Sequence, residues 1–151
     1  MGKSTALACL MSYKALSHVN GLSLCISTGA RAASELVRKA VQFAEAIKKL
    51  SHGKIDYSAS FDSVKFSNGC RVISLPSSDD GANLRGFSAH AVCIDEAAFI
   101  RNLEPQMQAI APTLTRDPNA ELIFATTPAG KSGYFYNNIY LPALNSPEWY
   151  V

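Results

Sequence analysis

The chain of 151 residues carries a formal net charge of +2, with 48% hydrophobic and 17% charged residues. This length gives one domain with a sizeable core, and this composition excludes an intrinsically disordered chain. No apolar stretch approaches the ~20 residues of a membrane span, so we expect an intracellular protein with no membrane partner, and the small charge does not by itself indicate a nucleic-acid partner.

The first part of the chain is predicted to form a helix, a strand and a second helix. Apolar side chains close to helical spacing predict a helix over residues 4–18, and Gly21 separates it from a short buried strand at 22–27. Residues 32–50 have the clearest amphipathic pattern, because apolar residues fill one broad face and charged residues fill the other. We expect Gly53 to end this helix, since glycine commonly follows a helix carboxyl end.

A β-hairpin is predicted next. Residues 63–66 and 71–75 read as two short strands, and Asn68-Gly69 lies between them. Asn-Gly between two such segments is a strong hairpin signal, since both residues readily adopt a positive φ. The residues that follow, 76–83, are polar and without periodicity, so we expect a loop there.

The second half of the chain returns to alternating strands and helices. Its predicted elements are, in order, a buried strand at 91–94, a helix at 103–114, a buried strand at 122–125 and a short helix at 134–141. Apolar strands that alternate with helices indicate an α/β fold with a mostly parallel sheet flanked by helices. Ligands of such sheets bind at the carboxyl ends of the strands. Four polar residues directly follow predicted strands: Asp95, Glu96, Thr126 and Thr127.

The amino-terminal segment has the tail of a phosphate-binding loop, G-x-x-x-x-G-K-[ST], in Gly2, Lys3, Ser4 and Thr5. A triphosphate needs backbone N–H groups at a helix N-terminus, a flexible cation, and a hydroxyl for Mg²⁺. Lys3 would reach the β- and γ-phosphates, and Ser4 would bind the metal. Four such residues also occur together by chance, and the first glycine of the motif and the strand before it are absent.

A second motif strengthens this interpretation. The buried strand at 91–94 ends in Asp95-Glu96, which is the Walker B pattern. Asp95 can hold Mg²⁺ through water, and Glu96 can orient and deprotonate the attacking water. The alternative is that the two acids only begin the next helix, where negative charge suits the helix dipole. After a G-K-S, the Walker B interpretation is the stronger of the two.

Thr126 and Thr127 follow the strand at 122–125, where two hydroxyls can sense a γ-phosphate and pass its presence to a moving segment. An ordinary strand-to-turn Thr-Pro sequence is the alternative. A second G-K-S at residues 130–132 also follows this strand. We reject it as the main phosphate site, because Ala125 replaces its first glycine and too few residues follow for a Walker B strand.

The cysteines and histidines do not predict a metal centre. The four cysteines are scattered without a C-x-x-C pair, and the three histidines have no partner at ligand spacing. We expect neither a zinc site nor a disulfide framework.

Taken together, these segments resemble the ATPase domain of phage large terminases. The resemblance runs from Gly2 to about Tyr140, and its specific part lies downstream of the G-K-S-T. It consists of Ser74-Leu75-Pro76-Ser77, Leu84-Arg85-Gly86-Phe87-Ser88, Cys93-Ile94-Asp95-Glu96-Ala97-Ala98-Phe99, Ala125-Thr126-Thr127-Pro128-Ala129-Gly130 and Gly133-Tyr134-Phe135-Tyr136.

The resemblance implies an additional-strand P-loop NTPase that uses ATP and Mg²⁺ to move double-stranded DNA into a procapsid. It also implies a homo-oligomeric ring, a portal protein and a small terminase subunit as partners, and a place at the procapsid portal in the host cytoplasm. Thr126 and Thr127 match the family's coupling motif, which links hydrolysis to domain movement. Arg85 matches an arginine before Walker B and is a candidate arginine finger or sensor, with a loop or ion-pair role as the alternative.

The chain departs from the family's pattern at both ends. We expect residues 1–151 to be a partial ATPase domain that begins inside Walker A and does not include the family's C-terminal nuclease domain. Without the phosphate-loop strand, the strand at 122–125 would be an apolar sheet edge and a template for aggregation. We therefore expect the isolated chain to be poorly stable and to hydrolyse little ATP.

Two other functions stay open at this point. A superfamily 2 helicase also combines G-K-[ST], D-E-x-x and a small-Thr motif, although it does not share the Arg85-Gly86-Phe87-Ser88 block. A non-catalytic remnant of a prophage gene would keep Asp95 and Glu96 without a working phosphate loop.

Overall fold

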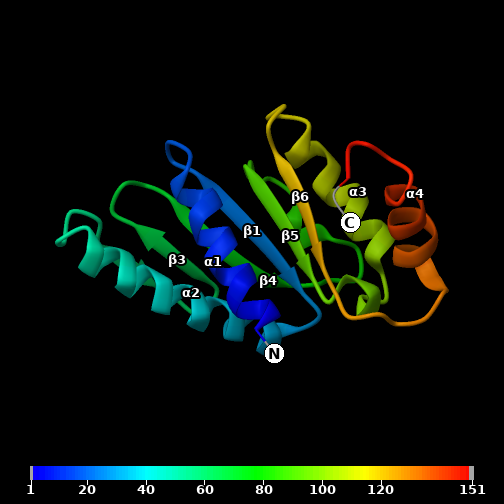
Figure 1. The fold of residues 1–151 in the computed structure, drawn as a ribbon, viewed down its shortest axis with the longest axis horizontal. Helices are drawn as coiled ribbons and strands as arrows, with labels where there is room; N and C mark the ends of the chain where they lie inside the picture. Colours follow the sequence, from blue (N-terminus) through cyan, green and yellow to red (C-terminus); the bar gives the residue numbers. More distant parts are fainter. Residues whose placement is uncertain (1, 150–151) are drawn as a thin grey trace.

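The computed structural model describes residues 2–149. Its backbone forms one six-stranded sheet with the strand order β2-β3-β4-β1-β5-β6, and helices lie on both faces (Figure 1). The elements, in chain order, are α1 (Lys3–Leu16), β1 (Leu22–Ser27), α2 (Ala30–Leu50), β2 (Tyr57–Ala59), β3 (Ser63–Phe66), β4 (Arg71–Pro76), the short 3₁₀ turns η1 (Ala82–Leu84) and η2 (Ala97–Phe99), with β5 (Ala91–Asp95) between them, then α3 (Leu103–Leu114), β6 (Glu121–Ala125), the π-helical η3 (Phe135–Tyr140) and α4 (Leu141–Ala143).

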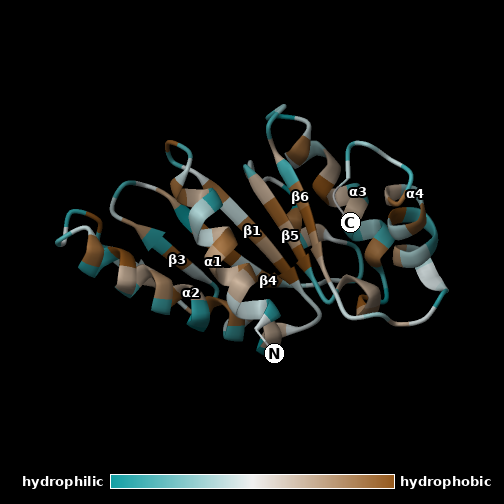
Figure 2. Cartoon of the chain, viewed as in Figure 1, coloured by the Kyte–Doolittle hydropathy of each residue, from teal (hydrophilic) through white to brown (hydrophobic). Residues whose placement is uncertain are grey.

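The four strands β4, β1, β5 and β6 run parallel, so their carboxyl ends meet at one edge of the sheet. Every residue of β1 and β5 is buried, because helices cover both faces of these central strands. Figure 2 shows that these buried central strands are largely apolar, whereas the outer side of α2 is hydrophilic. The α/β fold with a mostly parallel sheet is therefore confirmed.

Two apolar cores lie on the two faces of the sheet. On one face, Met11 of α1 and Leu36 of α2 pack on the side chains of Cys25 and Cys93. On the other face, the core joins α3 and η3 to the alternate residues of the same strands, which include Leu24, Ile26, Val92 and Ile94. Alternation along each strand supplies both cores, since successive side chains point to opposite faces.

Apart from the last helix, the predicted elements agree with the observed ones in type, and the differences are local. The strand at 22–27 and the helix at 103–114 have the predicted bounds, and α2 begins at Ala30, two residues before its predicted start at Ala32. The hairpin forms as expected, with Val64 opposite Val72 in an antiparallel pair. The last predicted helix is instead mainly a π-helical segment followed by one short α-turn.

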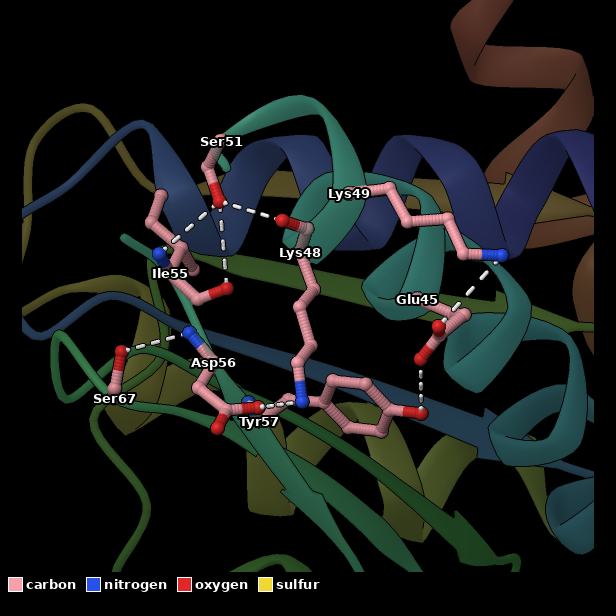
Figure 3. A network of polar contacts seen from close by, with 8 residues as sticks. All are labelled: Glu45, Lys48, Lys49, Ser51, Ile55, Asp56, Tyr57 and Ser67. Carbon is pink, nitrogen blue, oxygen red and sulfur yellow. Dashed lines mark hydrogen bonds and ion pairs between the residues drawn. The ribbon is translucent and has the colours of Figure 1, made fainter. Parts of the chain in front are cut away.

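Strand β2 is the one strand that the sequence pattern does not predict. It has three residues, none of them buried; it pairs antiparallel with β3, and the end of α2 contacts it (Figure 3). The Tyr57 hydroxyl donates to the Glu45 carboxylate at 3.1 Å, and the Lys48 amine lies 2.9 Å from the Asp56 carboxylate. The Lys48 hydrogen bond lowers the pKa of Asp56. The strand thus forms through its pairing with β3 and these contacts, which no local sequence pattern encodes.

Strand β6 forms the edge of the sheet, as expected for the strand at 122–125. It pairs with β5 alone, and Leu122, Ile123 and Phe124 are only partly buried. Its outer side lines a groove of about 710 Å³, with Phe135 and Trp149 among the other lining residues. In residues 2–149, none of the helices combines the length and apolar character needed to cross a membrane.

We predict that Gly21→Ala destabilises the fold. A β-carbon at Gly21 would lie 2.0 Å from the Ala15 carbonyl oxygen, so the backbone that joins α1 to β1 would have to move. Such overpacking costs about 1–3 kcal/mol in the free energy of unfolding, measured by urea denaturation. Gly29→Ala is the control, since nothing lies within 4 Å of its β-carbon position, and at this N-cap of α2 an alanine should cost less than about 1 kcal/mol. Equal effects of the two substitutions would contradict this packing.

Candidate functional site

Three elements bring polar side chains together at the carboxyl edge of the parallel strands. Glu96 follows β5, and its Oε1 lies 2.6 Å from the amine of Lys3 in the first turn of α1. Its Oε2 accepts hydrogen bonds from the backbone N–H and the hydroxyl of Thr127, each at 3.2 Å. One carboxylate therefore joins the start of α1 to the end of β6.

The backbone of Glu96 has a left-handed conformation, with φ 53° and ψ 41°. This region costs a residue with a β-carbon about 1–2 kcal/mol, and strained residues of this kind cluster at functional sites. The turn takes the chain out of β5 at once, and it allows the side chain of Glu96 to reach between Lys3 and Thr127. Because position 96 is neither glycine nor asparagine, the sequence does not predict this left-handed conformation.

The two neighbouring acids have opposite electrostatic environments. Asp95 is only 7% exposed, and burial, followed by the charge of Glu96, raises the pKa of its carboxyl group, while Lys3 acts against this. The hydrogen bond from Lys3 lowers the pKa of Glu96, and the two bonds from Thr127 add to this effect. Glu96 is thus held as a carboxylate, while Asp95 forms no direct ion pair with another residue in 2–149.

The chemistry of these donors fits a magnesium ion. Asp95 could supply a buried carboxylate, and Ser4 in the first turn of α1 could supply a hydroxyl. Mg²⁺ in proteins is commonly held by one or two carboxylates together with substrate phosphates. A divalent cation beside Asp95 would also offset the burial that raises its pKa. Within residues 2–149, no group of three His, Cys, Asp or Glu side chains has the geometry of a metal site.

The first turn of α1 is open to an anion. No side chain caps the helix, and no acidic residue lies in its first turn. The N–H groups of Thr5 and Ala6 already bond to the carbonyl of Gly2, both at 2.9 Å. Gly2 has φ 126°, a conformation that favours glycine. The earlier N–H groups of such a turn, together with the helix dipole, suit a phosphate.

Thr126 connects β6 to the turn after Glu96. Its hydroxyl oxygen accepts a hydrogen bond from the Ala98 N–H at 3.1 Å and donates one to the Thr127 carbonyl at 3.0 Å. Both threonines therefore bond to the segment that carries the acidic pair. The sequence places these residues at strand ends, but it does not reveal that Glu96 is the acceptor for Thr127.

Arg85 is not part of this cluster of contacts. It follows η1 and is exposed, and its guanidinium group forms no hydrogen bond or ion pair with any other residue in 2–149. The second G-K-S lies in an exposed loop after β6. The structure thus gathers Lys3, Glu96 and both threonines, places Gly2, Ser4 and Thr5 in the adjoining turn, and leaves Arg85 outside.

Sequence reasoning also missed a second polar cluster at the opposite, amino-terminal edge of the sheet. The rings of His18 and His90 stack with their centroids 4.3 Å apart, and His90 lies 3.9 Å from Asp117. Nearby, Lys14 of α1 forms an ion pair with Glu121 of β6. Wide sequence separation hides such pairs until the fold is known.

Residues 1–139 match the family model described as terminase large subunit, T4likevirus-type, N-terminal. Among solved structures, the ATPase domain of the Thermus phage P74-26 large terminase matches with a TM-score of 0.73 and 22% identity, covering 89% of this chain and 58% of that one. The HK97 bacteriophage large terminase matches with a TM-score of 0.64 and 18% identity, covering 85% of this chain and 27% of that one.

A large terminase from a thermophilic bacteriophage, solved in complex with ADP, matches with a TM-score of 0.63 and 15% identity, and the match covers 94% of this chain and 34% of that one. At these identities the solved structures establish the fold alone, which is that of terminase ATPase domains. The chain spans 58% or less of the length of these three structures. No curated protein matches the chain.

We predict that Asp95→Asn stabilises the protein in the absence of nucleotide. A carboxyl group whose pKa is raised by folding destabilises the fold when it is ionised, and this cost disappears below the pKa of the unfolded chain, near 3.8. Thermal unfolding should therefore show a higher Tm for Asp95→Asn than for the wild type at pH 7, and the difference should vanish as the pH falls below about 4.

Asp56→Asn is the control with the opposite sign. The pKa of Asp56 is lowered by Lys48, so loss of that carboxylate should leave Tm unchanged or slightly lower at pH 7. A lower Tm for Asp95→Asn at pH 7 would show that Asp95 is not the destabilising group described here.

Proposed function

We propose that this chain is the ATPase part of an enzyme that powers translocation of double-stranded DNA into a viral procapsid. The premise is that the chain belongs to the family of terminase large subunits of the T4likevirus type. The observation that carries this proposal is the convergence of Lys3, Glu96 and Thr127 at the carboxyl edge of parallel strands. An NTPase of this class needs a phosphate-binding helix start, an acidic pair and a responsive strand at one place.

The nucleotide would bind at the start of α1. Gly2, Lys3, Ser4 and Thr5 form a helix N-terminus without a capping side chain, which suits the phosphates of ATP. Ser4 and Asp95 would hold Mg²⁺, which neutralises charge on the β- and γ-phosphates when it is bound. Burial of Asp95 disfavours its ionised form, so a cation bound there would stabilise the buried carboxylate.

Glu96 would act as the general base. Its lowered pKa keeps it ionised at neutral pH, so it can orient a water molecule and accept its proton. In the structure Lys3 holds this carboxylate, so the amine must turn from Glu96 to the phosphates before Glu96 can act. The several negative charges of ATP compete well for one ammonium group, and nucleotide binding would thereby release the base.

The two threonines would couple hydrolysis to movement. Thr127 contacts the carboxylate that must change partners, and Thr126 bonds to the backbone of the turn that carries it. A change at Glu96 therefore reaches the end of β6 through hydrogen bonds of about 3 Å. This supports the assignment of Thr126 and Thr127 to the coupling motif.

Arg85 would serve as an arginine finger or sensor. Its guanidinium group is exposed and has no partner in residues 2–149, so it is available to a group outside this fold unit. In a homo-oligomeric ring, that group is the transferring phosphate bound to a neighbouring subunit, where a cation offsets the developing charge. The ring, the portal protein, the small terminase subunit, DNA and the location at the portal in the host cytoplasm all rest on the family.

We expect Glu96→Gln to lower kcat for ATP hydrolysis about 100-fold or more while ATP still binds. The amide keeps the size of the side chain but cannot accept a proton from water. The measurements are steady-state ATPase activity of the complete gene product with linear double-stranded DNA and binding of a fluorescent ATP analogue.

Glu45→Gln is the matched control, since Glu45 contacts Tyr57 at the far end of α2, and it should keep the wild-type kcat. Wild-type protein that binds no nucleotide would indicate a non-catalytic remnant instead. Full activity of Glu96→Gln would remove Glu96 from the mechanism.

A further inference from the structure

One stripe along α3 contacts the segment that carries Arg85. Within α3 the stripe consists of Gln106, Ala109 and Thr113, whose spacing of three and four residues puts them on one face of the helix, and Asn102 before α3 and Arg116 after it extend the stripe at both ends. Each of them touches the chain between Ser78 and Ser88 or, for Ala109, lies against Gly81 within it. The segment with Arg85 is therefore fastened along the whole length of α3.

The contacts before Arg85 hold the start of the segment. The Gln106 amide donates a hydrogen bond to the Ser78 carbonyl, and the Asn102 amide donates to the Asp79 carboxylate at 3.1 Å. Gly81 then passes so close to α3 that an added β-carbon would lie 2.8 Å from the β-carbon of Ala109. Its φ of 66° also favours glycine.

The contacts after Arg85 hold the end of the segment. The Thr113 hydroxyl donates to the Phe87 carbonyl at 3.0 Å, and the Arg116 guanidinium donates to the Ser88 hydroxyl at 2.8 Å. Between these two sets of contacts, Leu84, the last residue of η1, is fully buried. Arg85 is thus an exposed side chain between two fixed points.

Gln106 and Thr113 stand out in this stripe because they are polar and buried, at 0% and 4% exposure. A buried polar group is costly unless it is bonded, and each of these two bonds a backbone carbonyl of the segment. Gln106 Oε1 has no hydrogen-bond partner in the described part of the chain, so burial of the Gln106 side chain lowers the stability of the core. Apolar residues of similar size would fill both places without this cost.

Helix α3 also continues directly from the acidic turn. Glu96 is followed by η2, whose Ala98 bonds to Thr126, and α3 begins at Leu103. Helix α3 therefore connects Glu96, which exchanges Lys3 for a water molecule in the proposed function, with the segment that carries Arg85. This connection runs through packed and bonded groups, since Ile100 and Leu103 between them are buried.

We propose that Gln106 and Thr113 are positioning residues that fix Arg85 relative to Glu96, one on each side of it. The proposal rests on the proposed function, in which Arg85 acts on a phosphate outside its own fold unit. Removal of either bond frees one end of the segment, so Arg85 would spend less time in the orientation that hydrolysis needs. Neither residue touches the nucleotide.

The test uses Thr113→Val, which keeps the shape of the side chain and removes the donor, in the complete gene product. Thr113→Ser keeps the hydroxyl and should behave as the wild type. Thr115→Val makes the same chemical change on an exposed residue whose hydroxyl bonds only within α3, so it controls for loss of a threonine. Gln106→Met is the corresponding change on the other side of Arg85.

The first readout is hydrogen exchange, which does not depend on ATPase activity. In Thr113→Val and Gln106→Met, amides in residues 78–88 should exchange about 10-fold faster than in the wild type, while those of β1 stay unchanged. Unchanged exchange in 78–88 would overturn the proposal. Faster exchange throughout the protein would show a merely structural role and would overturn it as well.

The second readout is steady-state ATP hydrolysis. Thr113→Val should lower kcat on the order of 10-fold with little change in KM, because orientation is lost and binding is not. In an Arg85→Ala background the same substitution should cause no further loss.

An equal loss in that background would overturn the proposal. If Arg85→Ala keeps the wild-type kcat, the assigned role of Arg85 fails, and if the wild type hydrolyses no ATP, the proposed function itself fails.

Discussion

The Glu96 carboxylate is the interaction on which the rest of the site depends. It binds the Lys3 amine with one oxygen and the Thr127 backbone and hydroxyl with the other, so it joins three elements that are distant in sequence. The joint is possible because β5 and β6 are parallel neighbours whose carboxyl ends lie at one edge, and because α1 starts there. The left-handed backbone of Glu96 allows the chain to turn at this point, and the strain is held by the surrounding bonds.

The short stretch from Asp95 to Leu103 connects this joint to two parts of the molecule. Through Ala98 it bonds to Thr126 and hence to the edge strand β6. Through α3 it reaches the segment that carries Arg85. A group that changes partner at Glu96 can therefore influence both a sheet edge and an exposed cation. This layout supports the proposed motor function, in which the state of one nucleotide must be passed to other parts of an assembly.

The sequence predicts what burial and periodicity determine. Strand β1 was predicted with its observed bounds because it is covered on both faces and is therefore apolar for its full length. Strand β2 is not predicted because none of its three residues is buried, and pairing with β3 and contacts with α2 form it. The motifs predict that Lys3 and Glu96 act on the same nucleotide, but not their direct contact, since no local pattern encodes a left-handed glutamate or a pair so distant in sequence. The stripe on α3 is visible in the sequence only once its partner segment is known.

The most direct test is a crystal structure of the complete protein with Mg²⁺ and a non-hydrolysable ATP analogue. The account predicts that the Lys3 amine leaves Glu96 and contacts the β- and γ-phosphates, while Ser4 and Asp95 lie beside the metal and Glu96 faces the γ-phosphate. A nucleotide bound elsewhere, or a bound nucleotide with Lys3 still paired to Glu96, would contradict it.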